Sequence, residues 1–293
     1  MLNSKYQHTV NKDIIIQGVG VHSGEKAALK ISPAAEKSGI IFLRTDRNDV
    51  NNIIKAKWDN VSDTKLCTNI SNKEGVSVST VEHLMSAFSV LGVDNAVVEI
   101  DGSEVPIMDG SAKELIQAIK GVGLKRQKIQ RKAIKIIKPI SVSEKDSEVS
   151  LSPSDKRKFS FKLEYDNKVI GSQEHSYILD EDSFEKEIAP ARTFGLLHEV
   201  EYLRSIGLAR GGSLENAVVV DGDKILNSEG LRFENEFVRH KLLDAVGDLY
   251  MSGMPIIGDY HGHKAGHALN NQLLHELFAN PDCFEIIDYS PNN

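Results

Sequence analysis

The stretch EFVRHKLLDAVGDLY, residues 236–250, carries the clearest structural pattern in the sequence. Successive residues of a helix turn by about 100°, so His240, Asp244 and Asp248 fall on one face. The opposite arc is apolar and consists of Val238, Leu242, Leu243, Val246, Leu249 and Tyr250. The pattern predicts a long helix within residues 233–251, with one side in a hydrophobic core. A His/Asp pair four residues apart can hold a metal ion, but this helix alone favours a solvated face on which His240 pairs with Asp244.

The first half of the chain is predicted to place strands before helices. Strand-like runs occupy residues 13–16, 27–31, 40–44 and 96–100. Between the last two runs, Ser79 and Glu82 have the S/T-x-x-E spacing of a capping box, which predicts the start of a helix. Apolar residues at helical spacing and a closing glycine follow: Val81, Leu84, Met85, Phe88, Leu91 and Gly92. A second helix is expected over residues 111–120 and is closed by Gly121.

The second half repeats this order of elements. Strands are expected at residues 149–151, 159–163 and 218–220, ahead of the long helix. A final helix carries Leu269, Leu273, Leu274, Leu277 and Phe278. Strands first and helices later favour the α+β class over an alternating parallel sheet. We therefore expect an α+β protein with two domains, at residues 1–126 and 127–293.

The boundary between these domains is placed in a basic stretch. Seven cationic residues lie there: Lys125, Arg126, Lys128, Arg131, Lys132, Lys135 and Lys138. Such a stretch can bind phosphate or a membrane surface. Because the whole chain has a net charge of −7, we interpret it instead as a solvated linker that leads into a strand with a basic outer face.

Composition excludes several classes of protein. The chain has 293 residues, with 35 Lys and Arg against 42 Asp and Glu, and this acidic balance argues against a nucleic-acid binder. Two cysteines, Cys67 and Cys283, are too few for a disulfide scaffold and suggest a reducing compartment. No run approaches the roughly 18 apolar residues of a membrane span, and the amino terminus lacks the apolar core of a secretory signal. These features predict a cytoplasmic protein with no membrane span.

Common cofactor and redox motifs are missing from the sequence. The glycine-rich stretch GVGVHSG, residues 18–24, resembles a dinucleotide loop only partly, because Ser23 replaces the third glycine and no helical pattern follows. The sequence contains no phosphate-binding Walker loop. The distance between Cys67 and Cys283 excludes a CxxC redox site or a Cys-rich zinc site. Histidine and carboxylate chemistry is what remains.

Two further segments offer such groups. Glu82 and His83 begin the capped helix, although Glu82 alone is explained by the capping box. The segment HGHKAGHALNN, residues 261–271, contains three histidines; His261 and His263 are consistent with a His-rich turn, whereas His267 precedes the final helix.

Together these segments suggest a metal hydrolase. Two His and one Asp would supply the three protein ligands of a catalytic zinc site, with water as the fourth ligand. Glu82 could then take a proton from that water, and His267, oriented by Asp248, could protonate a leaving group. The segments lie far apart in the chain, and the sequence does not show that they meet.

Several long motifs resemble one family. They are STVEHLMSA, IMDGSA, ARTFG, GGSLENAVVV, EGLRFENEFVRHKLLDAVGDL and GHKAGHALNN. Together they resemble the UDP-3-O-acyl-N-acetylglucosamine deacetylases, the zinc amidases that commit bacteria to lipid A synthesis. The resemblance extends from GVGVHSG to HALNN, which is essentially the whole chain.

The resemblance implies roles for individual residues. It implies one zinc ion per chain, held by His83, His240 and Asp244. It implies Glu82 as general base and His267, supported by Asp248, as a second acid/base group. The Thr193 hydroxyl would help to hold the oxyanion. Substrate contacts are implied for Lys241, Phe194, Ser213 and Val21.

The resemblance also implies the fold and the reaction. The fold would be two similar two-layer β/α sandwich domains with the active site between them. An insert near residues 194–220 would form an apolar passage for the substrate's acyl chain, with Leu196, Leu197, Ile206, Leu208 and Val218 as its apolar residues. The reaction would remove the N-acetyl group from UDP-3-O-acyl-N-acetylglucosamine and release acetate. We expect a monomer.

Some alternatives stay open at the level of sequence. Leu214 and Asn216 are unusual in GGSLENA and should flank the passage, so the preferred acyl chain length is undecided. The native metal could be zinc or iron. Rival functions are another metal amidase, and a binding protein whose metal is structural. The absence of an HExxH motif argues against the commonest zinc peptidases.

Overall fold

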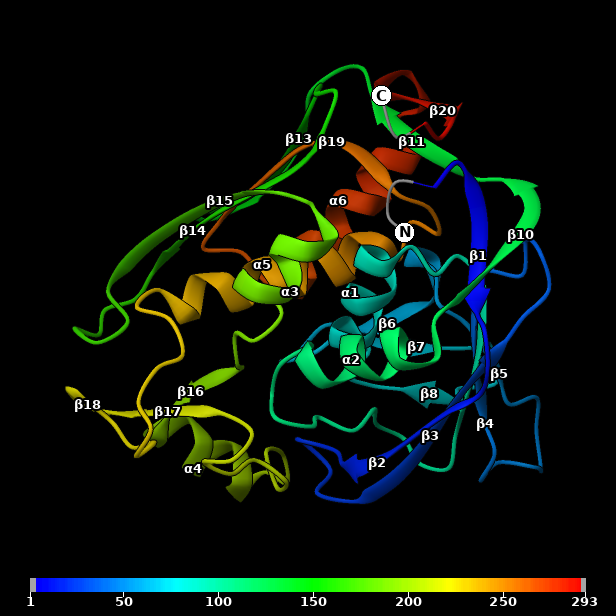
Figure 1. Cartoon of the computed structure of the whole chain (residues 1–293). Coiled ribbons are helices and arrows are strands. Elements are labelled where there is room, and N and C mark those ends of the chain that lie inside the picture. Colours follow the sequence, from blue (N-terminus) through cyan, green and yellow to red (C-terminus); the bar gives the residue numbers. More distant parts are fainter. Residues whose placement is uncertain (1–3, 291–293) are drawn as a thin grey trace.

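The computed structural model describes residues 4–290. Its central layer consists of helices that lie between two large sheets (Figure 1). These helices are α1 (Glu82–Leu91), α2 (Lys113–Val122), α5 (Glu236–Tyr250) and α6 (His267–Ala279). Their apolar sides, together with the inner faces of both sheets, form one continuous hydrophobic core. Within the described part of the chain, none of the helices has the length and apolar character needed to cross a membrane.

One large sheet comes from the first part of the chain and has the strand order β2-β3-β9-β4-β5. Its strands are β2 (Ile14–Val19), β3 (Lys26–Pro33), β9 (Ala96–Ile100), β4 (Ile40–Arg44) and β5 (Ile53–Lys55). In β3, alternate residues Ala27, Leu29 and Ile31 are buried, as expected for a strand with one face on the core. The β4 and β9 strands are parallel, whereas β3 and β9 are antiparallel.

The second large sheet has the order β12-β13-β19-β11-β20, with β14 also paired to β19 and β15 to β14. Its strands are β11 (Lys132–Ile136), β12 (Ile140–Glu144), β13 (Ser147–Ser152), β14 (Arg157–Glu164), β15 (Ser172–Ile178), β19 (Ile256–His263) and β20 (Phe284–Asp288). Helix α6 packs on β12 and β13, and α5 packs on β14 and β15.

Smaller elements complete the fold. One three-stranded sheet contains β6 (Val61–Asp63), β7 (Asn69–Ser71) and β8 (Ser77–Val78). Another contains β16 (Phe194–Leu196), β17 (Val218–Asp221) and β18 (Lys224–Ile225), and with α4 (Leu197–Ser205) it projects from the central layers (Figure 1). The remaining elements are β1 (Tyr6–Val10), β10 (Leu124–Gln130), α3 (Glu181–Glu187) and the short 3₁₀ helices η1 (Trp58–Asn60) and η2 (Pro281–Cys283).

The α+β class is confirmed, and the long helix and the final helix lie where the periodicity predicts them. The prediction that a capping box starts α1 is wrong. Helix α1 begins at Glu82, its N-cap residue is Val81, and no side chain caps it. The end of α1 is as predicted, because Gly92 has a φ of 74° and closes the helix. Gly121 lies inside α2, which instead ends before Gly123.

The basic stretch is not a solvated linker. Residues 124–130 form β10, which pairs antiparallel with β1. Arg131 is 1% exposed and donates hydrogen bonds to the Asp94 carboxylate at 2.7 and 2.8 Å, so this cation is neutralised inside the protein. The expected boundary at residues 126 and 127 therefore falls within a paired strand, and the division into two domains stays a prediction.

Candidate metal centre

The polar face of α5 is covered by α1 and is not exposed to solvent. His240, Asp244 and Asp248 are 2%, 4% and 4% exposed. In α1, Glu82 and His83 are 3% and 4% exposed and face the same space. The interpretation of this face as solvated is therefore wrong, since α1 and α6 both pack against α5 and bury these side chains.

Three of these side chains converge on one point. The Nε2 atoms of His83 and His240 lie 3.5 and 3.4 Å from Oδ1 of Asp244. The two imidazole rings are nearly perpendicular, with their centroids 5.1 Å apart. One ligand atom from each side chain lies within 4.8 Å of the other two, and among residues 4–290 this is the one group of His, Cys or acidic residues with that geometry.

The donor set fits a divalent cation. Oδ1 of Asp244 is buried and accepts no hydrogen bond, although a buried carboxylate oxygen without a partner is costly. Its nearest groups are the two imidazole nitrogens, which can act as metal ligands when neutral. A cation between the three side chains would satisfy all of these atoms.

Contacts behind the ligands fix their orientation and charge. Nδ1–H of His240 donates to the carbonyl oxygen of Ala191 at 3.0 Å, so Nε2 keeps its lone pair for the cavity. Burial lowers the pKa of His240 to about 3, which keeps the ring neutral. Lys241 donates to Oδ2 of Asp244 at 3.0 Å. Although burial opposes it, the neighbouring Lys241 ammonium group holds the pKa of Asp244 well below its usual range.

A second cluster lies beside the first and contains Glu82, His267 and Asp248. Nδ1–H of His267 donates to Oδ2 of Asp248 at 2.8 Å, and Nε2 of His267 lies 3.9 Å from Oε1 of Glu82. His267 is the first residue of α6, so the start of that helix sets the position of the ring.

Two residues that the sequence did not single out hold this second cluster. Thr68 donates from its backbone N–H to Glu82 at 3.0 Å and from its hydroxyl to Asp248 at 2.6 Å. Asn270 donates to Asp248 at 2.8 Å. Asn270 lies in the HALNN motif, which could have suggested it. Thr68 lies in a loop with no distinguishing pattern, and only the fold reveals its contacts.

Burial and neighbouring charges shift the pKa values of His267 and Glu82. Burial would lower the pKa of His267, but the carboxylates of Asp248 and Glu82 raise it to about 9. The ring is therefore a cation at neutral pH. Burial raises the pKa of Glu82, and the charge of His267 opposes that rise. A carboxylate of raised basicity beside a protonated imidazole is suited to move protons.

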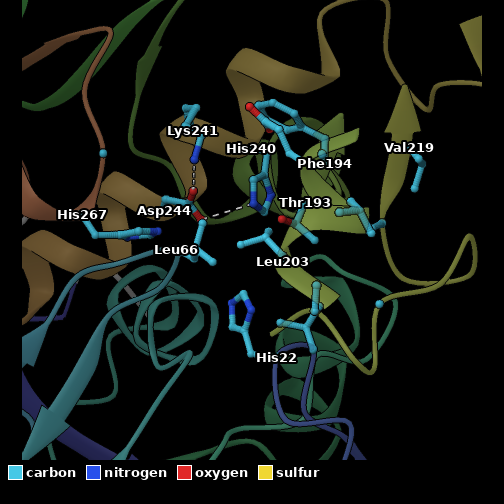
Figure 2. Close-up of a pocket in the computed structure, with 18 of the residues that line it drawn as sticks. His22, Leu66, Thr193, Phe194, Leu203, Val219, His240, Lys241, Asp244 and His267 are labelled. Carbon is cyan, nitrogen blue, oxygen red and sulfur yellow. Dashed lines mark hydrogen bonds and ion pairs between the residues drawn. The ribbon is translucent and has the colours of Figure 1, made fainter. Parts of the chain in front are cut away.

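Both clusters open into one cavity of about 860 Å³ (Figure 2). Its lining includes the candidate residues Val21, Glu82, His83, Thr193, Phe194, Ser213, His240, Lys241, Asp244 and His267. Figure 2 shows His240, Asp244 and His267 on one side of the cavity and His22, another residue not singled out in the sequence, on the other. Asp248 lies behind His267. The Nζ atom of Lys241 lies 5.7 Å from the centre of the Phe194 ring.

The apolar wall of the cavity differs from the prediction. Of the five apolar residues expected there, only Leu197 lines the cavity. Val218 is fully buried in the core, and Ile206 is 46% exposed. The wall instead contains Val200, Leu203, Leu214, Val219 and Leu226. The side of the wall on which each apolar residue lies depends on how α4 and β17 pack, which the composition of the segment does not encode.

His261 and His263 lie outside the cavity and do not form a turn. Both are on β19, where Nδ1 of His261 lies 3.2 Å from the Ser160 hydroxyl oxygen. Nε2 of His263 lies 3.5 Å from the Glu164 carboxylate.

Comparisons with known proteins show the family to which this chain belongs. Residues 7–279 match a family described as LpxC, UDP-3-O-acyl N-acetylglycosamine deacetylase. A protein named UDP-3-O-acyl-N-acetylglucosamine deacetylase from Phenylobacterium zucineum (strain HLK1) is 48% identical over 281 residues, covering 96% of both chains. Proteins of the same name from Saccharophagus degradans and Shewanella sp. (strain ANA-3) are 47% and 44% identical, each over 97% of this chain and 93% of the relative. The chain therefore belongs to the LpxC family of UDP-3-O-acyl-N-acetylglucosamine deacetylases.

Proposed function

We propose that this chain is a zinc-dependent amide hydrolase. Its reaction removes the N-acetyl group from UDP-3-O-acyl-N-acetylglucosamine and gives UDP-3-O-acyl-glucosamine and acetate, the committed step of lipid A biosynthesis. The observation that carries the proposal is the convergence of His83, His240 and Asp244 at a cavity that also has an apolar wall. Membership of the deacetylase family supports the same reaction.

The metal would be held by the two neutral imidazoles and the Asp244 carboxylate. This set matches the three protein ligands of catalytic zinc sites, which leave a further position open. When bound, zinc supplies Lewis acidity that polarises a carbonyl group and raises the acidity of water. Lys241 keeps Oδ2 of Asp244 occupied, so Oδ1 is the oxygen available to the metal.

Glu82 is assigned the role of general base. Burial raises the pKa of its carboxyl group, and Thr68 fixes Oε2, so Oε1 is the atom available to accept a proton from water. A base whose pKa lies closer to the working pH transfers protons more efficiently.

His267 is assigned the role of general acid. Its pKa of about 9 keeps it protonated at neutral pH, and its Nδ1–H is committed to Asp248. Nε2–H is therefore the proton that can pass to the departing amine, which must be protonated for the amide bond to break. Thr193 lines the same cavity, and its hydroxyl is assigned to the developing oxyanion.

The remaining lining residues are assigned to the substrate. Lys241 and Phe194 lie beside the metal ligands and would contact the sugar. Val21 and Ser213 line the same cavity and are also assigned to the substrate. The apolar wall would hold the acyl chain, with Leu214 among its contacts.

We also propose that the protein acts as a monomer in the cytoplasm, with its site between two β/α domains.

The test uses metal-free protein reconstituted with zinc. We expect one zinc ion per chain and release of acetate from UDP-3-O-acyl-N-acetylglucosamine. Glu82→Gln should bind the same amount of zinc but lose roughly 10²- to 10⁴-fold in turnover. A reconstituted protein that releases no acetate would contradict the proposal.

A structural metal is the competing function. A structural zinc site is closed by four protein ligands, whereas this site offers three. Inhibition by a hydroxamate, which needs an open position on the metal, separates the two functions.

A further inference from the structure

The glycine-rich loop GVGVHSG, residues 18–24, lies against the cavity, and its only assignment so far is the substrate contact of Val21. Val21 and His22 line the cavity, and Figure 2 shows the His22 ring on the side away from His240 and Asp244. Gly18 and Val19 are the last residues of β2, and the chain then returns to β3, so the ends of the loop are fixed in the first large sheet. Between these fixed ends, the backbone of the loop is held by hydrogen bonds to other parts of the chain.

A buried carboxylate holds this loop. Glu104 is 2% exposed and accepts hydrogen bonds from the backbone N–H of His22 at 2.9 Å and of Ser23 at 2.8 Å. It also accepts one from the Thr80 hydroxyl at 2.9 Å, two residues before the start of α1. All three donors are neutral. A buried carboxylate needs its hydrogen bonds, so Glu104 links the loop firmly to the segment that precedes Glu82 and His83.

The loop also contacts the insert at residues 194–220. The backbone N–H groups of Arg210 and Gly211 donate to the carbonyl oxygens of His22 and Val21, each at 3.1 Å. A Cβ atom at Gly211 would lie 2.2 Å from the carbonyl oxygen of Gly20, which leaves no room for a side chain. Gly20 is equally constrained, because its Cβ would lie 2.2 Å from Oε2 of Glu104. Glu104, the loop and the turn at residues 209–212 of the insert (the insert turn) are thus in direct contact.

The insert turn directly follows the helix that forms the apolar wall. Helix α4 ends at Ser205, and its residues Val200 and Leu203 line the cavity. The position at which Gly211 docks therefore sets the distance between α4 and the metal side of the cavity. A shift of this turn would change the width of the apolar passage without touching His83, His240 or Asp244.

We propose that the loop at residues 18–24 is the docking platform for the insert, and that Glu104 and Gly211 are positioning residues for the substrate's acyl chain. This inference rests on the proposed deacetylase function. It concerns how strongly an acylated substrate is preferred over the same UDP-sugar without its acyl chain.

The experiment compares Gly211→Ala with the unchanged protein. Both substrates, UDP-3-O-acyl-N-acetylglucosamine and UDP-N-acetylglucosamine, are assayed with zinc-loaded protein. We expect kcat/KM for the acylated substrate to fall roughly tenfold to hundredfold, mainly through a higher KM, because the passage is displaced. The rate with the unacylated sugar and the zinc affinity should not change. Gly121→Ala in α2 is the matched control, since a Cβ there has no atom within 4 Å.

Glu104→Gln tests the same contact from the other side. An amide retains one acceptor oxygen for His22 and Thr80 but presents an N–H donor toward the N–H of Ser23. We expect the same selective loss for the acylated substrate. Glu99→Gln, which alters a partly exposed carboxylate paired with Lys30, is the control for the loss of one charge.

The outcomes separate the inference from the proposed function. Failure of the unchanged protein to deacetylate either substrate contradicts the proposed function. The docking role is wrong if the unchanged protein is active and both variants keep its preference for the acylated substrate. It is also wrong if kcat/KM falls equally for both substrates. If Gly211→Ala does not fold, Glu104→Gln decides alone.

Discussion

Gly247 of α5 lies directly against the backbone of Glu82 in α1. A Cβ atom at position 247 would be 2.0 Å from the carbonyl oxygen of Glu82 and 3.0 Å from the backbone nitrogen of Ser86. The absence of a side chain lets the two helices approach closely at this crossing. Gly247 is flanked by Val246 and Asp248, so the close approach occurs within one turn of Asp244 and sets the gap that His83 must span.

Gly247→Ala should therefore destabilise the protein and weaken the metal site together. The added methyl group must push α1 away from α5, and overpacking of this kind costs about 1–3 kcal/mol. Urea unfolding and zinc titration of the metal-free protein measure the two effects. Gly121→Ala in α2 is the control, and it should be neutral or slightly stabilising because alanine favours a helix over glycine. Unchanged zinc affinity in Gly247→Ala would show that the crossing does not position the ligands.

Removing a ligand should abolish metal binding and turnover in parallel. His83→Ala and Asp244→Ala each delete one of three donors, so we expect a large drop in zinc content after dialysis, with activity lost in proportion. Elemental analysis beside the acetate-release assay measures both. Asp248→Asn is the matched comparison, because Asp248 contacts His267 and Thr68 and should retain zinc. Stoichiometric zinc in either ligand variant would remove that residue from the metal site.

His267 should titrate near pH 9 in the metal-free protein. Its pKa is raised to about 9 by Asp248 and Glu82 despite burial, compared with about 6.5 for an unfolded chain. A group with a raised folded pKa stabilises the fold fully below pH 6.5, and this contribution is lost as the pH rises through 9. NMR titration of the ring measures the pKa. Asp248→Asn should shift it downward, and an unshifted titration would show that Asp248 does not hold the proton.

The His267→Ala variant should retain its zinc, but its turnover rate should fall. The ring does not belong to the metal-ligand group, so zinc content should equal that of the unchanged protein. Turnover should fall roughly 10²- to 10⁴-fold, the usual contribution of an acid/base group. Normal turnover with full zinc occupancy would exclude His267 from proton transfer.

Breaking the buried ion pair between Arg192 and Glu236 should strongly destabilise the protein. Arg192 and Glu236 are 1% and 0% exposed, and the Arg192 Nε atom donates to Glu236 at 2.9 Å. Removal of the carboxylate leaves the buried guanidinium with only the half-exposed Glu229 as a counterion, so Glu236→Ala should cost about 3–5 kcal/mol. The exposed pair of Arg47 and Asp49 is the contrast, and Asp49→Ala should change stability by about 1 kcal/mol or less. Denaturant unfolding measures both, and equal losses would contradict this account.

Sequence pattern alone predicts the local structure around α5. The spacing of apolar residues in Glu236–Tyr250 predicts the helix and its core side, because helical periodicity is a property of neighbouring residues. It also determined the family, through motifs that extend along nearly the whole chain. The same local reasoning failed at Ser79 and Glu82, where the capping spacing is present but Glu82 turns to Thr68 instead.

Tertiary structure alone decided that the polar face of α5 is buried and that His83 reaches Asp244. These side chains lie far apart in the chain, and the crossing of α1 over α5 at Gly247 brings them together. It also decided which apolar residues of the insert face the cavity. Local periodicity orients a side chain on its own helix or strand, whereas burial and convergence depend on which other surface packs against it, and that is a property of the folded chain as a whole.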